Sequence, residues 1–286
     1  MITRRCTQRQ FLMRPDEETN NAYLYCLAVA AKRFRIEVLF TIALSNHHHT
    51  GLYDPHGKYP EFLEYFHKLF AKCQNVLRGR WENFWSAEQT SVVRLVSKND
   101  VLSKLAYALS NPVKDHLVEK AMDWPGVTSL PALLYNKELR AHRPRHFFRK
   151  DGEMPKQATL TFSRPKGCEQ LTHEQYAALV MERIEQVEDE ARRERRGGRV
   201  LGVKGVLRQR PTETPTTQEP RRGVNPRVAA QNKWHRIEAL LRNKRFQRAY
   251  AKARDAFKLG LGNVMFPAGT YWLARFAGVL VPLPAQ

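Results

Sequence analysis

The chain has 286 residues, of which 42% are hydrophobic, so it can bury a core of its own and a small stapled scaffold is excluded. Lys and Arg total 48 against 28 Asp and Glu, a formal net charge of +20, with +4 in residues 1–130 and +16 in residues 131–286. We therefore expect a polyanionic partner held largely by the later half, although charge alone also fits a basic protein that stays in solution or binds ribosomal or membrane surfaces.

Cysteines and terminal segments indicate the compartment. The four cysteines are far apart and form no CxxC pair, which speaks against a zinc knuckle or a disulfide framework; they are Cys6, Cys26, Cys73 and Cys168. The first residues lack the apolar segment of a signal peptide, and the apolar run at 271–284 contains Arg275 and is too short to cross a bilayer. We expect a soluble, unexported protein in the cytoplasm, associated with the nucleoid and without a membrane partner.

The first 130 residues alternate between strand-like and helix-like patterns. The order strand, helix, strand, strand, helix, strand, helix predicts an α+β fold, an antiparallel sheet covered by helices. The segment 47–53 either continues the strand before it or forms its hairpin partner. The expected strands are 2–11, 35–44, 47–53 and 91–96, and the expected helices are 15–31, 60–77 and one capped by Ser97 or Asn99.

The later half divides by composition into three regions. Residues 131–210 form a basic connector with a charged helix over 172–196, and residues 211–227 are a Pro/Thr-rich extended linker. Residues 228–286 form a basic, helical region in which cationic and aromatic side chains interleave, a pattern that suits nucleic acid. The residues expected to contact DNA are Arg221, Arg222, Lys233, Arg236, Arg242, Lys244, Arg245 and Arg248.

The strongest local motif is the run Ser45-Asn46-His47-His48-His49. Because alternate side chains of a strand share one face, His47 and His49 would point the same way and His48 the opposite way. Neutral imidazoles bind several divalent ions, and a third ligand with oxygen would suit Mg²⁺ or Mn²⁺. The alternative is an exposed histidine run without function at a strand end.

Tyr107 and Asn111 form the second motif. On one continuous helix their i, i+4 spacing puts the phenol and the carboxamide on the same face, about one turn apart. The competing interpretation is a helix break, with Asn111 as N-cap and Pro112 as the first residue of the next helix, and Tyr107 an ordinary core residue.

Both motifs resemble those of a known family. The segments SNHHHTGLYD at 45–54 and LAYALSNPVKDHLV at 105–118 are similar, in order and spacing, to the two active-site motifs of REP-associated tyrosine transposases. The similarity extends to the opening ITRRCTQRQ, to residues 218–226 and to FPAGTYWLARFAGV at 266–279, so it covers most of the chain. One departure is His48, where the family pattern usually has a hydrophobic residue.

The resemblance implies an HUH nuclease-like fold, a ferredoxin- or RRM-like sandwich, in residues 1–130. It implies that His47, His49 and Asn111 are metal ligands for Mg²⁺ or Mn²⁺ and that Tyr107 is the nucleophile. The implied activity is a transposase that cleaves and rejoins single-stranded DNA through a 5′-phosphotyrosine intermediate, at repeat sequences that form hairpins.

Two other functions share these features. A relaxase or rolling-circle initiator has the same histidine pair and tyrosine but recognises an origin, and the segment at 266–279 favours the transposase. A domesticated nucleic-acid-binding protein would keep the fold and lose turnover, so its DNA binding would not depend on metal or on Tyr107. A monomer and a homodimer with exchanged helices both fit the sequence.

Overall fold

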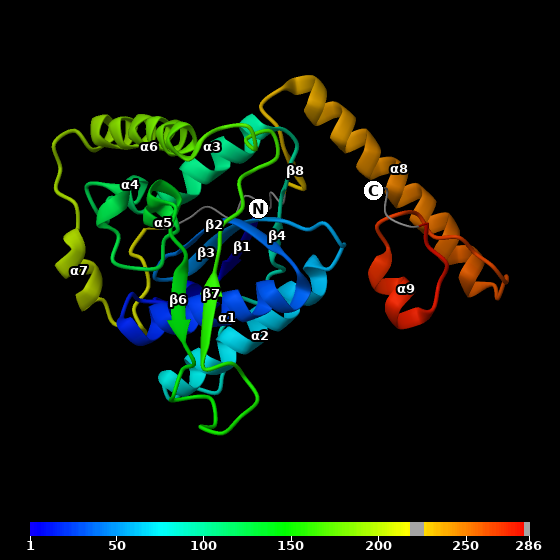
Figure 1. Ribbon diagram of the computed structural model, residues 1–286, viewed down its shortest axis with the longest axis horizontal. Coiled ribbons are helices and arrows are strands. Elements are labelled where there is room, and N and C mark those ends of the chain that lie inside the picture. Colours follow the sequence, from blue (N-terminus) through cyan, green and yellow to red (C-terminus); the bar gives the residue numbers. More distant parts are fainter. Residues whose placement is uncertain (218–225, 283–286) are drawn as a thin grey trace.

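A four-stranded sheet with helices on both faces forms the body of the protein, and a long helical arm extends from one side of it (Figure 1). The computed structural model describes residues 1–217 and 226–282. The sheet has the order β2-β3-β1-β4, and all its neighbouring strands are antiparallel. Its strands are β1 Ile2–Arg5, β2 Glu37–Ala43, β3 His47–Tyr53 and β4 Ser91–Val92. The expected α+β architecture with an antiparallel sheet is thereby confirmed at this level.

Two long helices cover one face of the sheet. They are α1 Glu17–Phe34 and α2 Tyr59–Leu77, and the first hydrophobic core lies between them and the sheet. Asp16 caps α1, because its side chain accepts a hydrogen bond from the Thr19 backbone N–H at 2.8 Å. Both helices agree with the sequence expectation, and α2 ends at Leu77, directly before Arg78 and Gly79.

Shorter helices and one long charged helix cover the opposite face, around the second hydrophobic core. Ser97 caps the first of them in a reciprocal arrangement with Asp100, which selects Ser97 over Asn99 as the helix start. The long helix buries Tyr176, Val180 and Ile184 against this core and exposes most of its charged residues. The helices are α3 Lys98–Leu109, α4 Asn111–Lys114, α5 Leu130–Tyr135, α6 His173–Arg195 and α7 Gly202–Arg208.

Packing continues past residue 130. Strands β6 Leu139–His142 and β7 Gln157–Leu160 pair antiparallel beside α1, and Ala141 and Leu160 join the first core. The second core extends to Val206. The described part of the expected linker contacts the start of the chain, where the Phe11 N–H donates to the Glu213 carbonyl at 2.9 Å. The functional boundary expected at residue 130 stays a prediction, and the hydrophobic cores run across it.

The first strand is shorter than the expected 2–11. After β1 the chain turns into a short 3-10 helix, η1 Thr7–Arg9, with Gln8 and Arg9 at positive φ of 49° and 59°. Left-handed residues cannot continue a strand, so the expected strand does not run on through Gln8 and Arg9. The expected strand 91–96 also divides: β4 pairs with β1, whereas β5 Arg94–Leu95 pairs in parallel with β8 Val228–Ala229.

β2 and β3 form a hairpin, which decides between the two interpretations of residues 47–53. The register shifts between Val38 and Phe40, so Leu39 is an extra residue in β2. Gly51 lies opposite Phe40, and a Cβ at this position would stand 2.1 Å from the Phe40 ring. Glycine is therefore required where the ring lies over the neighbouring strand.

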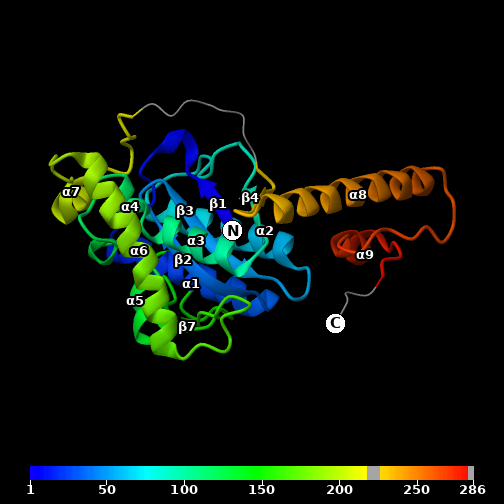
Figure 2. The same ribbon diagram turned by 90° about the horizontal axis from the view of Figure 1, so that it is seen from above.

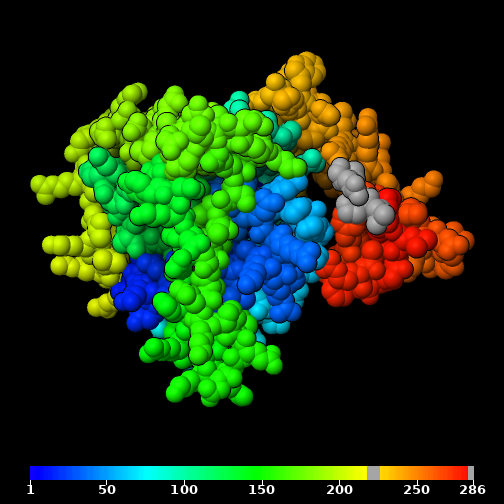
Figure 3. Space-filling model, viewed as in Figure 1, coloured from blue at the N-terminus to red at the C-terminus, as the bar shows by residue number. Residues whose placement is uncertain are grey.

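The arm contains helix α8 Lys233–Lys258, which projects away from the sheet, and helix α9 Tyr271–Ala277 beside it (Figure 2). In the space-filling view the arm stands out from one side of the body (Figure 3). Its own core is small: in the described arm, Ala253, Phe266 and Val279 are the buried members. The arm joins the body through the β5–β8 pair, through the Gln231 N–H, which donates to Asp100 at 2.7 Å, and through an ion pair of Arg275 with Glu61.

Two general expectations concern the thiols and the membrane. All four cysteines are free and buried, in agreement with the absence of a disulfide framework. Within residues 1–217 and 226–282, no helix combines the length and the apolar composition needed to cross a bilayer.

Candidate active site

β3 carries the histidine run, and its alternation separates the three rings. His47 and His49 face the side of the sheet covered by α3, with their ring centroids 4.9 Å apart. On that face they stand next to Arg5 and Thr3, their partners on β1. The predicted sharing of one face by His47 and His49 therefore matches the β3 geometry.

Asn111 joins the two histidines from the other side. Its Nδ2 lies 2.9 Å from Nε2 of His49 and 3.4 Å from Nε2 of His47. It is the first residue of α4, and Ser110 separates it from the end of α3. The helix break thus falls one residue earlier than the expected Asn111 cap. Asn111 nevertheless faces the two histidines, as it would on one continuous helix.

Neighbouring polar groups fix the orientation of both imidazoles. Nδ1 of His47 lies 2.7 Å from Oδ1 of Asn46, and Nδ1 of His49 lies 2.7 Å from Oγ1 of Thr3. An Nδ1–H that donates to Asn46 leaves the Nε2 lone pair of His47 directed at the site. Such partners are the groups that orient metal-binding histidines in general.

Both rings are held neutral. Desolvation lowers the pKa of His47 well below its ordinary value, and the nearby His49, Arg5 and Arg9 lower it further. Desolvation, with smaller contributions from Arg5 and Lys104, lowers the pKa of His49 to about 4. Neutral imidazoles keep a lone pair near pH 7, which a metal ligand requires.

Tyr107 lies on α3 at the edge of this site. Its ring centroid is 6.1 Å from that of His49, and its side chain is 38% exposed, so it can be reached from solvent. The alternative that placed Tyr107 in the core does not agree with this exposure.

Two lysines flank the Tyr107 ring. Nζ of Lys104 lies 4.9 Å and Nζ of Lys114 4.6 Å from the ring centroid. The sequence reasoning missed both. Lys104 is three residues before Tyr107 and was detectable from helical spacing, whereas Lys114 reaches the ring only because the chain turns at Ser110.

His48 points to the opposite face, as the alternation predicts. It is fully buried, with its Nε2 3.0 Å from Nε2 of His67 and its ring edge-on to Tyr23 and Phe66. A polar ring thus occupies the position where the resembling family has a hydrophobic residue, because His67 on α2 gives it a hydrogen-bond partner.

The expected DNA-contacting residues do not lie at this site. The six that the structure describes are exposed on α8, and they are Lys233, Arg236, Arg242, Lys244, Arg245 and Arg248. Arg221 and Arg222, with most of the segment 218–226, lie outside the described residues.

Among the residues that the structure describes, no group of three His, Cys, Asp or Glu side chains is placed to hold a metal ion. A metal site at His47 and His49 therefore depends on the Asn111 carboxamide as its third group.

Comparisons with known proteins do not assign this chain to a family. No family model matches the chain, and no curated protein matches it. A solved structure of a REP-associated tyrosine transposase bound to a REP hairpin is similar, with 16% identity over 53% of this chain and 82% of that one, and a TM-score of 0.39. At these values the similarity assigns neither a family nor an activity, and the functional argument rests on the site residues.

Proposed function

We propose that this chain is a single-stranded DNA transposase that cleaves and rejoins strands through Tyr107. The observation that carries the proposal is the convergence of four side chains from three elements: His47 and His49 on β3, Tyr107 on α3 and Asn111 at the start of α4. A nucleophile beside two neutral imidazoles and a carboxamide is an arrangement suited to phosphodiester chemistry.

The donor set fits Mg²⁺ or Mn²⁺. Two Nε2 atoms face one carboxamide, and exchange of the two ends of the Asn111 amide would present its oxygen to the same space. When bound there, such an ion supplies Lewis-acid polarisation of the scissile phosphodiester. Asn46 and Thr3 hold the two imidazoles in place whether or not an ion is present.

Tyr107 supplies the covalent step. Its phenolic oxygen forms a bond to phosphorus and gives up its proton to solvent, while the bond from phosphorus to the 3′-oxygen breaks and the departing 3′-oxygen takes up a proton from solvent. The products are a 5′-phosphotyrosine and a strand that ends in a 3′-hydroxyl. Attack by a 3′-hydroxyl on the phosphotyrosine reverses these changes and joins two strands, so no nucleotide cofactor is needed.

Lys104 and Lys114 stabilise negative charge at this step. Both ammonium groups lie within 5 Å of the Tyr107 ring centroid, where they attract the phosphate of the strand and stabilise the negative charge that develops during the attack. A phenol is otherwise a weak nucleophile near pH 7, since its reference pKa is about 10.

The partner is single-stranded DNA with hairpins. Tyr107 is only partly exposed, and a flexible strand reaches such a side chain more readily than a stacked duplex does. The exposed cations of α8 supply a second, sequence-independent contact, so the affinity falls steeply as salt rises.

The test is formation of a covalent adduct. Purified protein is mixed with 3′-labelled oligonucleotides that contain hairpins, in Mn²⁺ or Mg²⁺, and run on a denaturing gel. Wild type is expected to give a protease-sensitive labelled band, Tyr107→Phe none, and His49→Ala at most about a hundredth of the wild-type rate, because the loss of a ligand exceeds the 10–100-fold loss typical of its supporting groups.

The matched control is His56→Ala, which removes an exposed histidine outside the site and is expected to keep full activity. Binding of the same oligonucleotides in EDTA should be equal in wild type and Tyr107→Phe. A wild-type protein that binds them in a salt-sensitive way without an adduct would favour the non-catalytic DNA-binding alternative. An adduct that persists in Tyr107→Phe would contradict the assigned nucleophile.

A further inference from the structure

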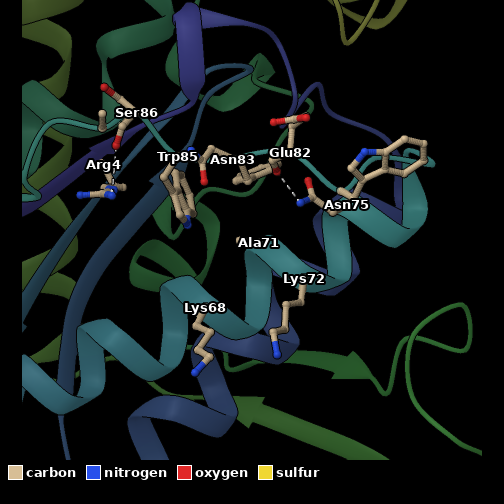
Figure 4. A pocket seen from close by; sticks show the side chains of 12 residues that line it. Arg4, Lys68, Ala71, Lys72, Asn75, Glu82, Asn83, Trp85 and Ser86 are labelled. Carbon is tan, nitrogen blue, oxygen red and sulfur yellow. Dashed lines mark hydrogen bonds between the residues drawn. The ribbon is translucent and has the colours of Figure 1, made fainter.

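A groove on the α2 side of the body lies outside the site described so far (Figure 4). It encloses about 420 Å³, within the range of small-molecule sites. Lys68, Ala71 and Lys72 of α2 form one side, and the loop 81–87 forms the other. In Figure 4 the two lysines extend from α2 on one side of Ala71, and Asn83 and Trp85 lie on the other side.

The loop is held rigidly against the sheet. Arg4 donates to the carbonyls of Ser86 and Glu88 and to the Thr90 hydroxyl, at 2.8–3.2 Å. The Asn75 side-chain amide donates to the Glu82 carbonyl at 2.8 Å, and the Trp85 indole N–H donates to the His67 carbonyl at 2.9 Å. A groove with fixed walls needs little ordering when it binds a ligand.

Trp81 is the outlier in this loop. It is 88% exposed, whereas Trp85 packs edge-on to Phe84 with ring centroids 4.7 Å apart. A largely exposed indole leaves its faces available for stacking. Two exposed lysines one helical turn apart, Lys68 and Lys72, accompany it, with Glu82 the single acid among the lining residues.

We propose that this groove and the adjoining lysines of α2 bind an unpaired segment of the DNA strand, with one base stacked on Trp81 and backbone phosphates on Lys68 and Lys72. Every base has a π-face, so an exposed indole beside cations is a sequence-tolerant platform for single strands. The net positive lining excludes a cationic ligand, and the wide indole surface favours a planar base over an acidic side chain.

The position of the groove connects it to the histidine site. Arg4 and Arg5 are adjacent residues of β1. Arg5 stands beside His47 in the histidine site, and Arg4 donates a hydrogen bond to the groove loop on the other face of the sheet. The groove therefore contacts a different part of the strand from the nucleotide that Tyr107 attacks.

This inference rests on the proposed function, since it assigns a second contact to the same strand, and it is tested by binding alone. The full chain is titrated in EDTA with a fluorescent hairpin oligonucleotide that carries single-stranded flanks. Trp81→Ala is expected to raise Kd about tenfold, in line with the loss of one stacked base, and Trp81→Phe to stay within about threefold of wild type. Lys68→Gln with Lys72→Gln should lower the salt slope by about 1–2.

The matched control is Tyr135→Ala, which removes an aromatic side chain that is 61% exposed elsewhere on the body and should leave Kd unchanged. Flanks that contain 5-iododeoxyuridine should crosslink under ultraviolet light to the peptide with Trp81. An unchanged Kd for Trp81→Ala, or an acidic peptide whose binding alone depends on Trp81, overturns the proposal.

Failure of the groove and failure of the catalytic proposal give different results. Trp81-dependent binding without a covalent adduct supports the groove and contradicts strand transfer. An adduct that forms in Mn²⁺ with a Trp81-independent Kd supports strand transfer and contradicts the groove.

Discussion

The body and the arm use the same kinds of residue in opposite ways. In the body, aromatic rings and histidines are buried between sheet and helices, and burial keeps the imidazoles neutral. In the arm, Trp234, Leu240 and Leu241 are exposed among lysines and arginines, and α8 has few neighbours to pack against. Enclosure suits reactive groups that must be oriented, whereas an open basic and aromatic face suits a long flexible polyanion.

Substitutions in the cores of the body and the arm should have the largest effects and should show whether the two parts unfold separately. Phe70→Ala removes a fully buried ring that packs against Tyr23 and Phe84, and we expect the free energy of unfolding of the body to fall by about 3–5 kcal/mol. Phe266→Ala removes a comparably buried ring from the small core of the arm. It should increase proteolysis of α8 without shifting the main urea transition. Equal shifts from both variants would mean that body and arm unfold as one unit.

Neutralising the arm should have the next largest effect. The triple variant Arg242→Gln, Lys244→Gln, Arg245→Gln removes three exposed cations from α8, so the slope of log affinity against log salt should fall by about 2. The control is a triple Gln variant at Arg193, Arg196 and Arg199, which are exposed on the body. If both triple variants changed the slope equally, α8 would contribute no more to DNA binding than other exposed cations of the protein.

The smallest effect concerns the cap of α1 and its pH dependence. Burial raises the pKa of Asp16, but hydrogen bonds from Arg78, Thr19 and Arg14 lower it more, to about 2. Because the folded pKa lies below the ordinary 3.8, the ionised Asp16 contributes stability above about pH 4, and this contribution is lost as pH falls through 2.

Asp16→Asn keeps an acceptor for the cap and removes the charge. We expect it to cost about 1–2 kcal/mol in urea unfolding at pH 7 and almost nothing near pH 2. Glu17→Gln, at an exposed neighbouring position, is the control and should stay within about 0.5 kcal/mol at both pH values. A cost for Asp16→Asn that is the same at both pH values would contradict this role of the ion pairs.

Local sequence patterns predicted much of the site but less of the fold. Period-two alternation was enough to separate His48 from His47 and His49, and helical spacing brought Tyr107 near Asn111. The turn at Ser110, which brings Lys114 to Tyr107, depends on how α4 packs and has no clear local signal. The extension of both cores beyond residue 130 arises from contacts between segments distant in sequence, which composition does not encode.

The first strand shows the same limit. Residues after Cys6 alternate loosely, but Cys6 bridges to Trp85 and the chain turns there. A contact across 79 residues thus overrides a weak local preference. The identity of the metal, the covalent chemistry and the DNA contacts stay predictions that the experiments above address.

Because three histidines are adjacent, the specific activity of the protein depends on the register in which β2 pairs with β3. A slip by one residue would turn His48 alone towards Asn111 and would bury His47 and His49 on the other face. Gly51 against the Phe40 ring and the extra residue Leu39 favour the correct pairing. A slipped chain would have the same mass and the same composition as a correct one. The active fraction of refolded protein should therefore be counted from the yield of covalent adduct per chain in a single turnover, because protein concentration alone would count both forms.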